Sequence, residues 1–264
     1  MPVITNPIFS ESTEGLSEVL STQGYQLLLG QTRYDRAREA DLVETFLGRK
    51  VDGLVMTGRV EDGPLRTRLR RTGVPLVETW DIGPRPLDLM VGFSNEDAAA
   101  AAVQHLLARG YRSVGFIGGT DLRSEMRLAG CRRALREAGA EAPHAIRLSS
   151  PTTSSLDAGA AALDALRQAQ PGLRAVFCSN DMIAAGVLFE AQRQGIAVPG
   201  TLAIMGFSDL PIARATVPAL STVRVRAHEI GAAAARLLLD RIAQRPISDA
   251  LLDLGYSLIA RAST

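Results

Sequence analysis

The feature that most constrains the fold is a regular alternation of short apolar runs with longer amphipathic segments. The runs at 51–58 and 113–118 have the length of strands, and each ends at a glycine. The segment 35–48 has helical spacing instead, with Leu42 and Phe46 on one face. Strands that alternate with helices form parallel sheets covered by helices on both faces. We therefore expect an α/β fold with parallel, doubly wound sheets.

The same reasoning divides the rest of the chain. Strands are expected at 25–30, 51–58, 75–80, 89–93, 113–118, 145–148, 174–178 and 202–207. Helices are expected at 11–23, 35–48, 64–72, 95–110, 123–139, 156–168, 181–195 and 228–243, followed by an apolar segment at 251–259.

Composition excludes several classes of protein. The 264 residues are 46% hydrophobic and 22% charged, as in an ordinary globular protein, and the net charge of +1 gives no sign of a nucleic-acid-binding face. Cys131 and Cys178 are too few for a disulfide framework, so we expect buried thiols in a reducing compartment. The first residues do not resemble a signal peptide, and no apolar run is long enough to span a membrane. These features predict a cytoplasmic protein that has no membrane partner.

Motifs for catalysis are missing. His105, His144 and His228 lie on separate predicted elements without metal-ligand spacing. The glycines at 115–119 lack the pattern of a dinucleotide or phosphate loop, and no nucleophile elbow occurs. We therefore predict a protein that is not an enzyme and has neither cofactor nor metal.

A polar turn follows the last predicted strand of the second βα series. Gly206, Phe207, Ser208 and Asp209 stand where a parallel strand opens at its carboxyl end, which is where open α/β sheets bind ligands. With the segment 218–223, Pro-Ala-Leu-Ser-Thr-Val, this turn resembles in order and spacing the "G-[FY]-D-D … P-x-L-T-T-[VI]" region of effector domains of the lactose/galactose-repressor (LacI/GalR) family.

The resemblance spans nearly the whole chain and implies a fold. It implies two Rossmann-like lobes with parallel sheets, of the periplasmic-binding-protein-like type I, with an effector cleft between them. It places the N-terminal lobe at 1–93 plus 226–248 and the C-terminal lobe at 94–225 plus 249–264. Family members carry an apolar strand before the motif matched by residues 3–9, and a helix-turn-helix before that; this sequence has almost none of the strand and lacks the helix-turn-helix.

The resemblance also implies effector-binding residues. Ile8 and Phe9 match an aromatic pair at the cleft, although Phe9 could instead staple the following helix. Arg127 matches a cleft arginine, and its alternative is a solvated charge on a helix face. Asn180 is expected to face the ligand, whereas Asp181 is expected to cap the helix that follows. Asp209 is assigned a structural role.

Ser208 guides the choice of ligand, because most family members have an aspartate there. Without that carboxylate an anionic ligand is accommodated more easily, and Arg127 would attract it. Trp80, in Glu-Thr-Trp-Asp, together with Val-Gly-Phe-Ser-Asn at 91–95 and Gly-Phe-Ser-Asp-Leu at 206–210, makes the chain resemble the branch of gluconate-operon repressors. Arg123 lies on the same helical face as Arg127 and could add a second cation. Ser154, in the segment 151–155, could line the site with a hydroxyl or belong to a helix cap.

The predicted function is the effector-sensing domain of a DNA-binding transcriptional repressor that binds a sugar or a sugar acid. The resemblance implies a homodimer, with the helix at 11–23 near the partner, and operator DNA bound through an N-terminal domain missing from these 264 residues. The alternative is a periplasmic-type solute-binding protein of a sugar transporter, which shares the fold. An α/β enzyme is a more distant possibility.

Overall fold

The computed structural model describes residues 1–4, 6–61, 63–148 and 155–264. The chain forms two compact units, each built from separate parts of the sequence. Unit 1 comprises Met1–Ser94 and Arg226–Gly255, and unit 2 comprises Asn95–Val225 and Tyr256–Thr264. The chain therefore passes between the units three times. Along the described residues, no helix has the length and apolar content needed to cross a bilayer.

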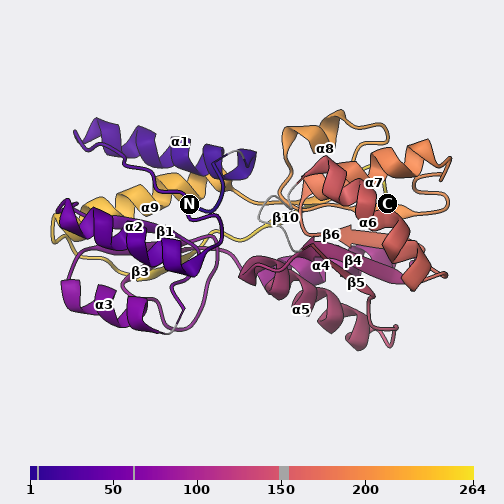
Figure 1. Ribbon diagram of the computed structural model, residues 1–264, viewed down its shortest axis with the longest axis horizontal. Coiled ribbons are helices and arrows are strands. Elements are labelled where there is room, and N and C mark those ends of the chain that lie inside the picture. Colours follow the sequence, from indigo (N-terminus) through magenta and orange to yellow (C-terminus); the bar gives the residue numbers. More distant parts are fainter. Residues whose placement is uncertain (5, 62, 149–154) are drawn as a thin grey trace. The chain divides into compact units, whose positions relative to one another are not determined.

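Unit 1 contains a parallel sheet in the order β1-β2-β3-β9 (Figure 1). One face is covered by α9, which contacts β2 and β3 and packs lengthwise against α1. The other face carries a cluster that joins Val43 of α2 and Leu69 of α3 to Leu54 and Leu76 of the sheet. The bounds of the elements are α1 Pro7–Thr22, α2 Arg36–Gly48, β1 Leu54–Thr57, α3 Pro64–Thr72, β2 Leu76–Thr79, β3 Leu89–Gly92, α9 Ala227–Ile242 and β9 Leu251–Asp253.

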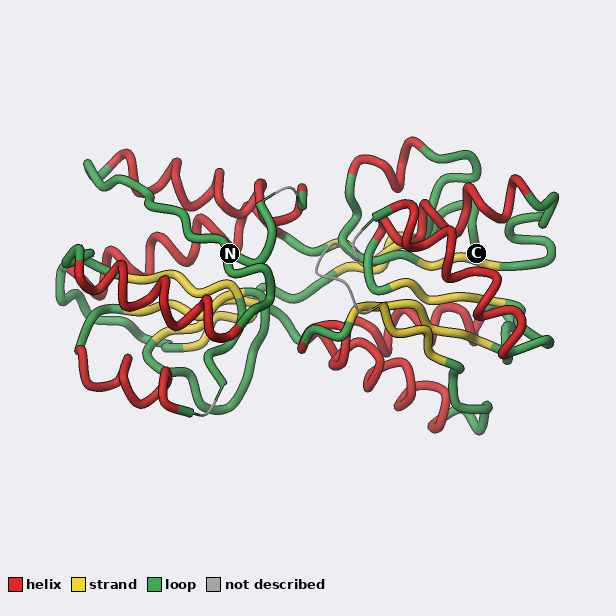
Figure 2. The backbone as a smooth tube through the Cα atoms, viewed as in Figure 1, coloured by secondary structure: helices red, strands yellow, loops and turns green. Residues whose placement is uncertain are grey.

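Unit 2 repeats this plan with a parallel sheet in the order β5-β4-β6-β7. Figure 2 shows the strands in yellow and the helices in red. Helices α6 and α7 pack together and share a core with one face of the sheet, and α4 and α5 pack together on strands β4 and β6. A short antiparallel pair, β8 with β10, completes the unit. The bounds are α4 Asn95–Ala108, β4 Val114–Gly119, α5 Leu122–Glu137, β5 Ala145–Leu148, α6 Leu156–Ala169, β6 Ala175–Cys178, α7 Asp181–Arg193, β7 Ala203–Met205, α8 Pro211–Ala215, β8 Thr222–Arg224 and β10 Ser257–Ile259.

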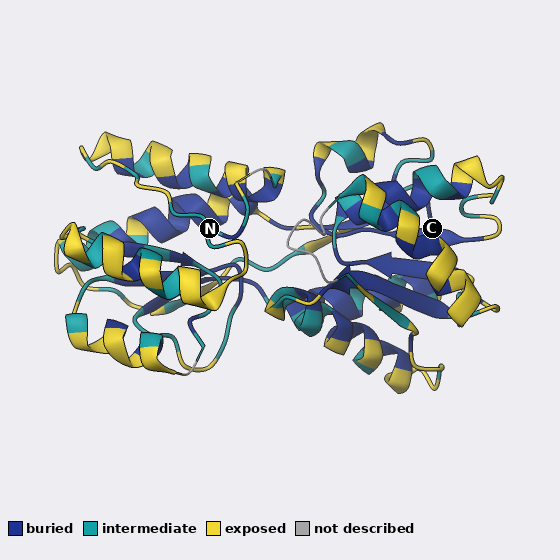
Figure 3. Cartoon of the chain, in the orientation of Figure 1, coloured by how far each residue is buried: buried dark blue, intermediate teal, exposed yellow. Residues whose placement is uncertain are grey.

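The central strands are buried on both faces, as parallel sheets require (Figure 3). Several helices begin directly after a side chain that accepts a hydrogen bond from the first turn. Asn6 accepts from the Ile8 amide ahead of Pro7, and Asp35 accepts from the Ala37 amide. Cys131 and Cys178 are buried and unpaired, and burial raises the pKa of both thiols, that of Cys131 to about 12, so neither is a reactive thiolate at neutral pH.

Glycines let the backbones of paired helices come into direct contact. A Cβ on Gly186 of α7 would collide with the Leu156 carbonyl oxygen of α6, and one on Gly159 of α6 would collide with the Ile183 carbonyl oxygen of α7. Gly231 of α9 has the same relation to the Ser12 carbonyl of α1. The close pairing of these helices therefore depends on positions without side chains.

Two segments differ from the sequence prediction. Residues 25–30 form no strand, because no strand in the described part of the chain pairs with them. The segment expected at 251–259 is two strands: Leu251–Asp253 pairs with β3, so residues 249–255, expected in the C-terminal lobe, belong to unit 1. The chain enters unit 2 only after Gly255, which adopts a left-handed backbone conformation at φ 65°.

Candidate functional site

The candidate site is the carboxyl edge of the sheet in unit 2. Strands β4, β6 and β7 are parallel, so the polar residues that follow them gather at one edge. Ser179 and Asn180 follow β6, and the turn at 206–209 follows β7. Helix α5 brings Arg127 to this edge.

Arg127 is held in place by three neighbours from different elements. Its guanidinium lies over the ring of Phe207, 3.8 Å from the centroid. Its Nε donates to Asn95 Oδ1 at 3.0 Å, and one terminal nitrogen donates to the Ser179 carbonyl oxygen at 2.5 Å. Both acceptors are neutral, so these two bonds orient the cation without cancelling its charge. A half-buried, oriented guanidinium is well suited to bind an oxygen-rich anion.

The turn after β7 is held in an unusual backbone conformation. Ser208 has φ 120° and Asp209 has φ 57°, both in a region that residues other than glycine rarely adopt. The Ser208 amide donates to the Val223 carbonyl at 2.7 Å, and the Asp209 amide donates to Thr222 Oγ1 at 3.3 Å. Strand β8 therefore fixes the turn and, with it, the position of the Ser208 hydroxyl.

Asp209 makes two ion pairs. One oxygen lies 2.7 Å from Arg224 Nε, and the other lies 2.6 Å from a terminal nitrogen of Arg261. Its side chain is only 5% exposed. The structural role expected for Asp209 is therefore that of a buried carboxylate that joins two arginines.

Asn180 and Asp181 have different roles from those expected. Asn180 is the residue that caps α7, because its side chain accepts a hydrogen bond from the Ile183 amide at 2.9 Å. The expectation that Asp181 caps this helix is therefore wrong. Asp181 is fully buried and accepts instead from the Leu210 amide at 2.7 Å and from Thr222 Oγ1 at 2.6 Å. The reason is the chain direction: Asn180 has extended backbone, as a cap requires, whereas Asp181 lies inside the first turn and faces the 206–210 loop. Burial raises the pKa of Asp181 to about 6.

Arg123, the second cation expected at the site, lies one turn before Arg127 on α5 and is half-buried. It stands near Asp121. Burial opposes ionisation of that carboxyl, but Arg123, the Ser124 hydroxyl and Arg127 together hold its pKa below the ordinary value. Ser154 lies outside the described residues.

The three residues expected from unit 1 lie at the start of α1 and after β2. Ile8, Phe9 and Trp80 are 7%, 4% and 4% exposed. The rings of Phe9 and Trp80 meet edge to face, with centroids 5.3 Å apart. This contact supplies a packing role for both rings. Their roles in effector binding stay predictions.

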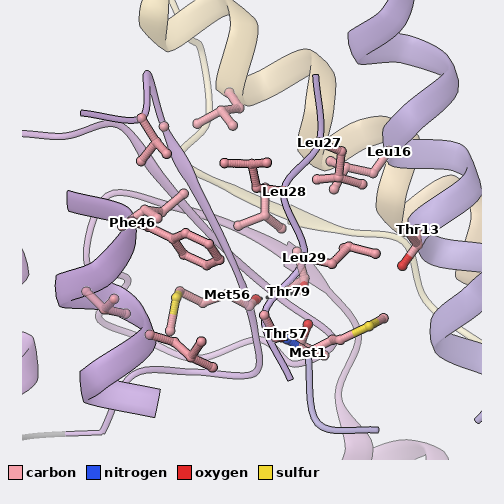
Figure 4. A pocket seen from close by; sticks show the side chains of 18 of the residues that line it. Met1, Thr13, Leu16, Leu27, Leu28, Leu29, Phe46, Met56, Thr57 and Thr79 are labelled. Carbon is pink, nitrogen blue, oxygen red and sulfur yellow. Dashed lines mark hydrogen bonds between the residues drawn. The ribbon is translucent and has the colours of Figure 1, made fainter. Parts of the chain in front are cut away.

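A separate cavity of about 410 Å³ lies within unit 1 (Figure 4). Leu27, Leu28 and Leu29 line it from the unpaired segment, and Leu54 and Met56 of β1 line it from the sheet. Leu28 and Leu29 are 51% and 49% exposed. A sugar or sugar acid needs several convergent polar groups, and most of the residues that line this cavity are apolar. We therefore place the candidate site in unit 2 and not in this cavity.

Hydrogen bonds at the mouth of the cavity follow the pattern of a parallel sheet. The Met1 nitrogen donates to the Gly30 carbonyl at 2.7 Å, and the Thr32 amide donates to the Met1 carbonyl at 2.9 Å. The cavity thus begins where this short ladder stops, between residues 25–30 and β1. The segment 25–30, which was expected to be a strand, thus borders this cavity.

Several residues that shape the site were not expected from the sequence. Asn95 and Ser179 position Arg127, and Arg224 and Arg261 position Asp209. Ser179 could have been found, because it directly follows a predicted strand. Asn95 ends the segment 91–95, which carries part of the resemblance, but it was given no role. Arg224 and Arg261 are distant in sequence from Asp209. Within the described ranges, no group of three or more His, Cys, Asp or Glu side chains is placed to hold a metal ion.

Comparison with known proteins agrees with this architecture. Residues 103–264 match the family model described as a periplasmic binding protein-like domain. The HTH-type transcriptional regulator GntR of Pseudomonas aeruginosa PAO1 is 38% identical over 265 residues, an alignment that covers 100% of this chain and 77% of that protein. Among solved structures, the transcription regulator GntR from Chromobacterium violaceum is 37% identical with a TM-score of 0.93, covering 100% of this chain and 97% of that one.

A LacI family transcriptional regulator from Silicibacter pomeroyi is 36% identical with a TM-score of 0.92, covering 100% of this chain and 96% of that one. All three similar proteins are described as transcription regulators and none as an enzyme. The chain therefore belongs to the LacI family of transcriptional regulators, with GntR-type regulators among its relatives, and it forms the periplasmic-binding-protein-like, effector-binding part of such a regulator.

Proposed function

We propose that this chain senses a small, oxygen-rich anion, a sugar acid of the gluconate type, at the carboxyl edge of the sheet in unit 2. The observation that carries the proposal is the position of Arg127. Its guanidinium lies over Phe207, the residue directly before Ser208, and is oriented by the neutral oxygens of Asn95 and Ser179. A fixed cation therefore stands beside a turn that presents a hydroxyl where most family members have a carboxylate.

The charges near this turn favour an acid over a neutral sugar. A carboxylate at position 208 would repel an anionic ligand, and the serine removes that repulsion. The nearest carboxylate along the chain, Asp209, is paired with two arginines. A hydrogen bond between a charged pair contributes about 1.5–3 kcal/mol, equivalent to about 10- to 150-fold in affinity. This contribution is large enough to decide between an acid and its uncharged analogue.

Other expected contacts complete the proposal. Arg123 would add a second cation, and Ile8, Phe9 and Trp80 of unit 1 stay candidates for contacting apolar faces of an effector. Because the ligand would bind one arrangement of the protein more tightly, it would shift the equilibrium of a homodimer on operator DNA, bound through a separate DNA-binding domain in the cytoplasm. A transport role is not favoured, since the relatives are transcription regulators.

The test is a thermal-shift and calorimetric screen of the chain against gluconate, 2-ketogluconate, neutral hexoses and pentoses, and purines. A ligand at about 100 times its dissociation constant adds about 2.7 kcal/mol to the unfolding free energy. Arg127→Ala should weaken binding of a sugar acid about 10- to 150-fold. Arg132→Ala, an exposed arginine on the same helix, is the matched control and should bind like the wild type.

Ser208→Asp gives a second, opposite test. This variant should bind the sugar acid more weakly than the wild type does, and it should bind a neutral sugar of the same length as well as the wild type does. Binding of neutral sugars or purines alone, or equal loss in the Arg127 and Arg132 variants, would contradict the proposed acid site.

A further inference from the structure

We infer that Asp209 is a positioning residue that couples the effector turn to the chain segments joining the two units. The inference rests on the proposed effector site, because it assigns to that site a route by which occupancy reaches the rest of the protein. Asp209 directly follows Ser208 and, at 5% side-chain exposure, is a buried carboxylate with two arginine partners.

The two partners lie on two different connections between the units. Arg224 is the last residue of β8, and the chain enters unit 1 between Val225 and Arg226. Arg261 follows β10, which is the first element after the chain returns at Gly255–Tyr256. Strands β8 and β10 are paired with each other, with Val223 opposite Leu258. One carboxylate therefore ties the outgoing and the returning segment to the same turn.

The third connection is tied to the site through Arg127. The chain first leaves unit 1 between Ser94 and Asn95. Asn95 is buried, and its Oδ1 accepts from Arg127 Nε at 3.0 Å. Each of the three connections is thus hydrogen-bonded to Arg127 or Asp209, and a ligand on Arg127 and Ser208 would act at the same points.

The conformation of the turn gives the coupling a physical basis. Ser208 and Asp209 have φ 120° and 57°, which cost conformational free energy unless the surroundings hold them. The holding contacts are the Ser208 amide on the Val223 carbonyl and the two arginines on Asp209. A ligand that forms a hydrogen bond with the Ser208 hydroxyl would strengthen or weaken these contacts. Because β8 and the β10 segment share them, the stability of both would change together.

Hydrogen–deuterium exchange on the full chain tests the inference, first without any ligand. Asp209→Asn keeps the shape of the side chain and removes its charge. Exchange at 222–224 and 257–259 should rise together by about tenfold or more, as loss of a charged hydrogen bond allows, while 114–117 and 175–178 stay unchanged. Arg224→Gln should raise exchange mainly in β8. Glu96→Gln, which breaks the pair with Arg133 on α5, is the control and should leave β8 and β10 as in the wild type.

A second arm adds gluconate at saturation. In the wild type, gluconate should change exchange at 127, at 179–180 and in β8 and β10. In Asp209→Asn it should still bind and still change exchange at 127 and 179–180, but the change in β8 and β10 should be lost. If gluconate fails to bind the wild type, the proposed effector is wrong. The ligand-free measurements still test whether Asp209 holds β8 and β10 together. Unchanged ligand-free exchange in β8 and β10, or an equal rise throughout unit 2, would overturn the inference.

Discussion

Replacing Gly186 by alanine should destabilise unit 2, although alanine is the better helix former. Alanine in a helix is favoured over glycine by about 1 kcal/mol. At Gly186, however, the new Cβ would lie well inside 3.0 Å of the Leu156 carbonyl oxygen, a separation that real Cβ atoms do not adopt. A carbon and an oxygen in contact stand about 3.3 Å or more apart, so α6 and α7 must separate.

The magnitude follows from these opposing effects. Overpacking a core costs typically 1–3 kcal/mol, and the upper end applies here because a helical carbonyl cannot rotate away as a side chain can. Subtracting the propensity gain of about 1 kcal/mol leaves a net loss of about 2 kcal/mol. For a chain of this size that loss lowers the unfolding midpoint by about 4–8 °C.

Thermal unfolding followed by circular dichroism, with urea unfolding as a second measure, checks this value. Gly48→Ala is the matched control: it ends α2, and its Cβ would meet nothing within 4 Å, so the midpoint should stay or rise. The change at Gly186 should appear as a lower urea midpoint with an unchanged slope. If Gly186→Ala instead stabilises the chain as Gly48→Ala does, the helices have room to adjust and the reasoning from close approach is wrong.

Two further predictions concern charge and the cavity of unit 1. Because burial raises the pKa of Asp181 from 3.8 to about 6, the native state keeps that proton where the unfolded chain has lost it. The unfolding free energy of the wild type, relative to that of Asp181→Asn, should therefore be greatest below about pH 3.8 and fall as the pH rises to about 6; a flat difference in urea unfolding between pH 3.5 and 7.5 would contradict the assigned pKa. An extension of five apolar residues before Met1, such as Val-Val-Leu-Val-Val, should continue the Met1–Gly30 ladder into the cavity and raise the unfolding midpoint by about 3 °C or more, at about 1.5–3 kcal/mol for each side chain fully buried. A Ser-Gly-Ser-Gly-Ser extension is the control, and an equal effect of both would show that the cavity does not accept a strand.

Local patterns predicted the elements well where each pattern has one structural solution. The alternation of apolar runs and amphipathic segments predicted two parallel sheets covered by helices, because only strands buried on both faces explain runs such as 175–178. The segment 25–30 has the same composition, but a strand exists only when a neighbour pairs with it. The composition of a segment does not show whether another strand lies beside it. Likewise, residues 249–255 join unit 1 because they pair with β3, a contact between distant parts of the chain.

The site was predicted only as far as sequence order allows. Arg127, Asn180 and Ser208 were placed near one sheet edge, since parallel strands share their carboxyl ends. Which of Asn180 and Asp181 caps α7 depends on one pair of backbone angles, and the sequence favoured the wrong one. The two arginines on Asp209 lie 15 and 52 residues away, and no local rule pairs residues over such distances.

The pairing of α1 with α9 has a consequence for the order of events during synthesis. The apolar side of α1, which includes Leu16 and Leu20, leaves the ribosome early, but its partner helix emerges only after all of residues 95–225. At about 5–20 residues per second that delay is on the order of 10–40 s. Throughout this interval α1 lacks its partner helix, and by its end residues 95–225, which form most of the second unit, have been made. The apolar face of α1 therefore stays without its partner while most of the second unit is made, and this face is the part of the nascent chain that depends on protection from aggregation.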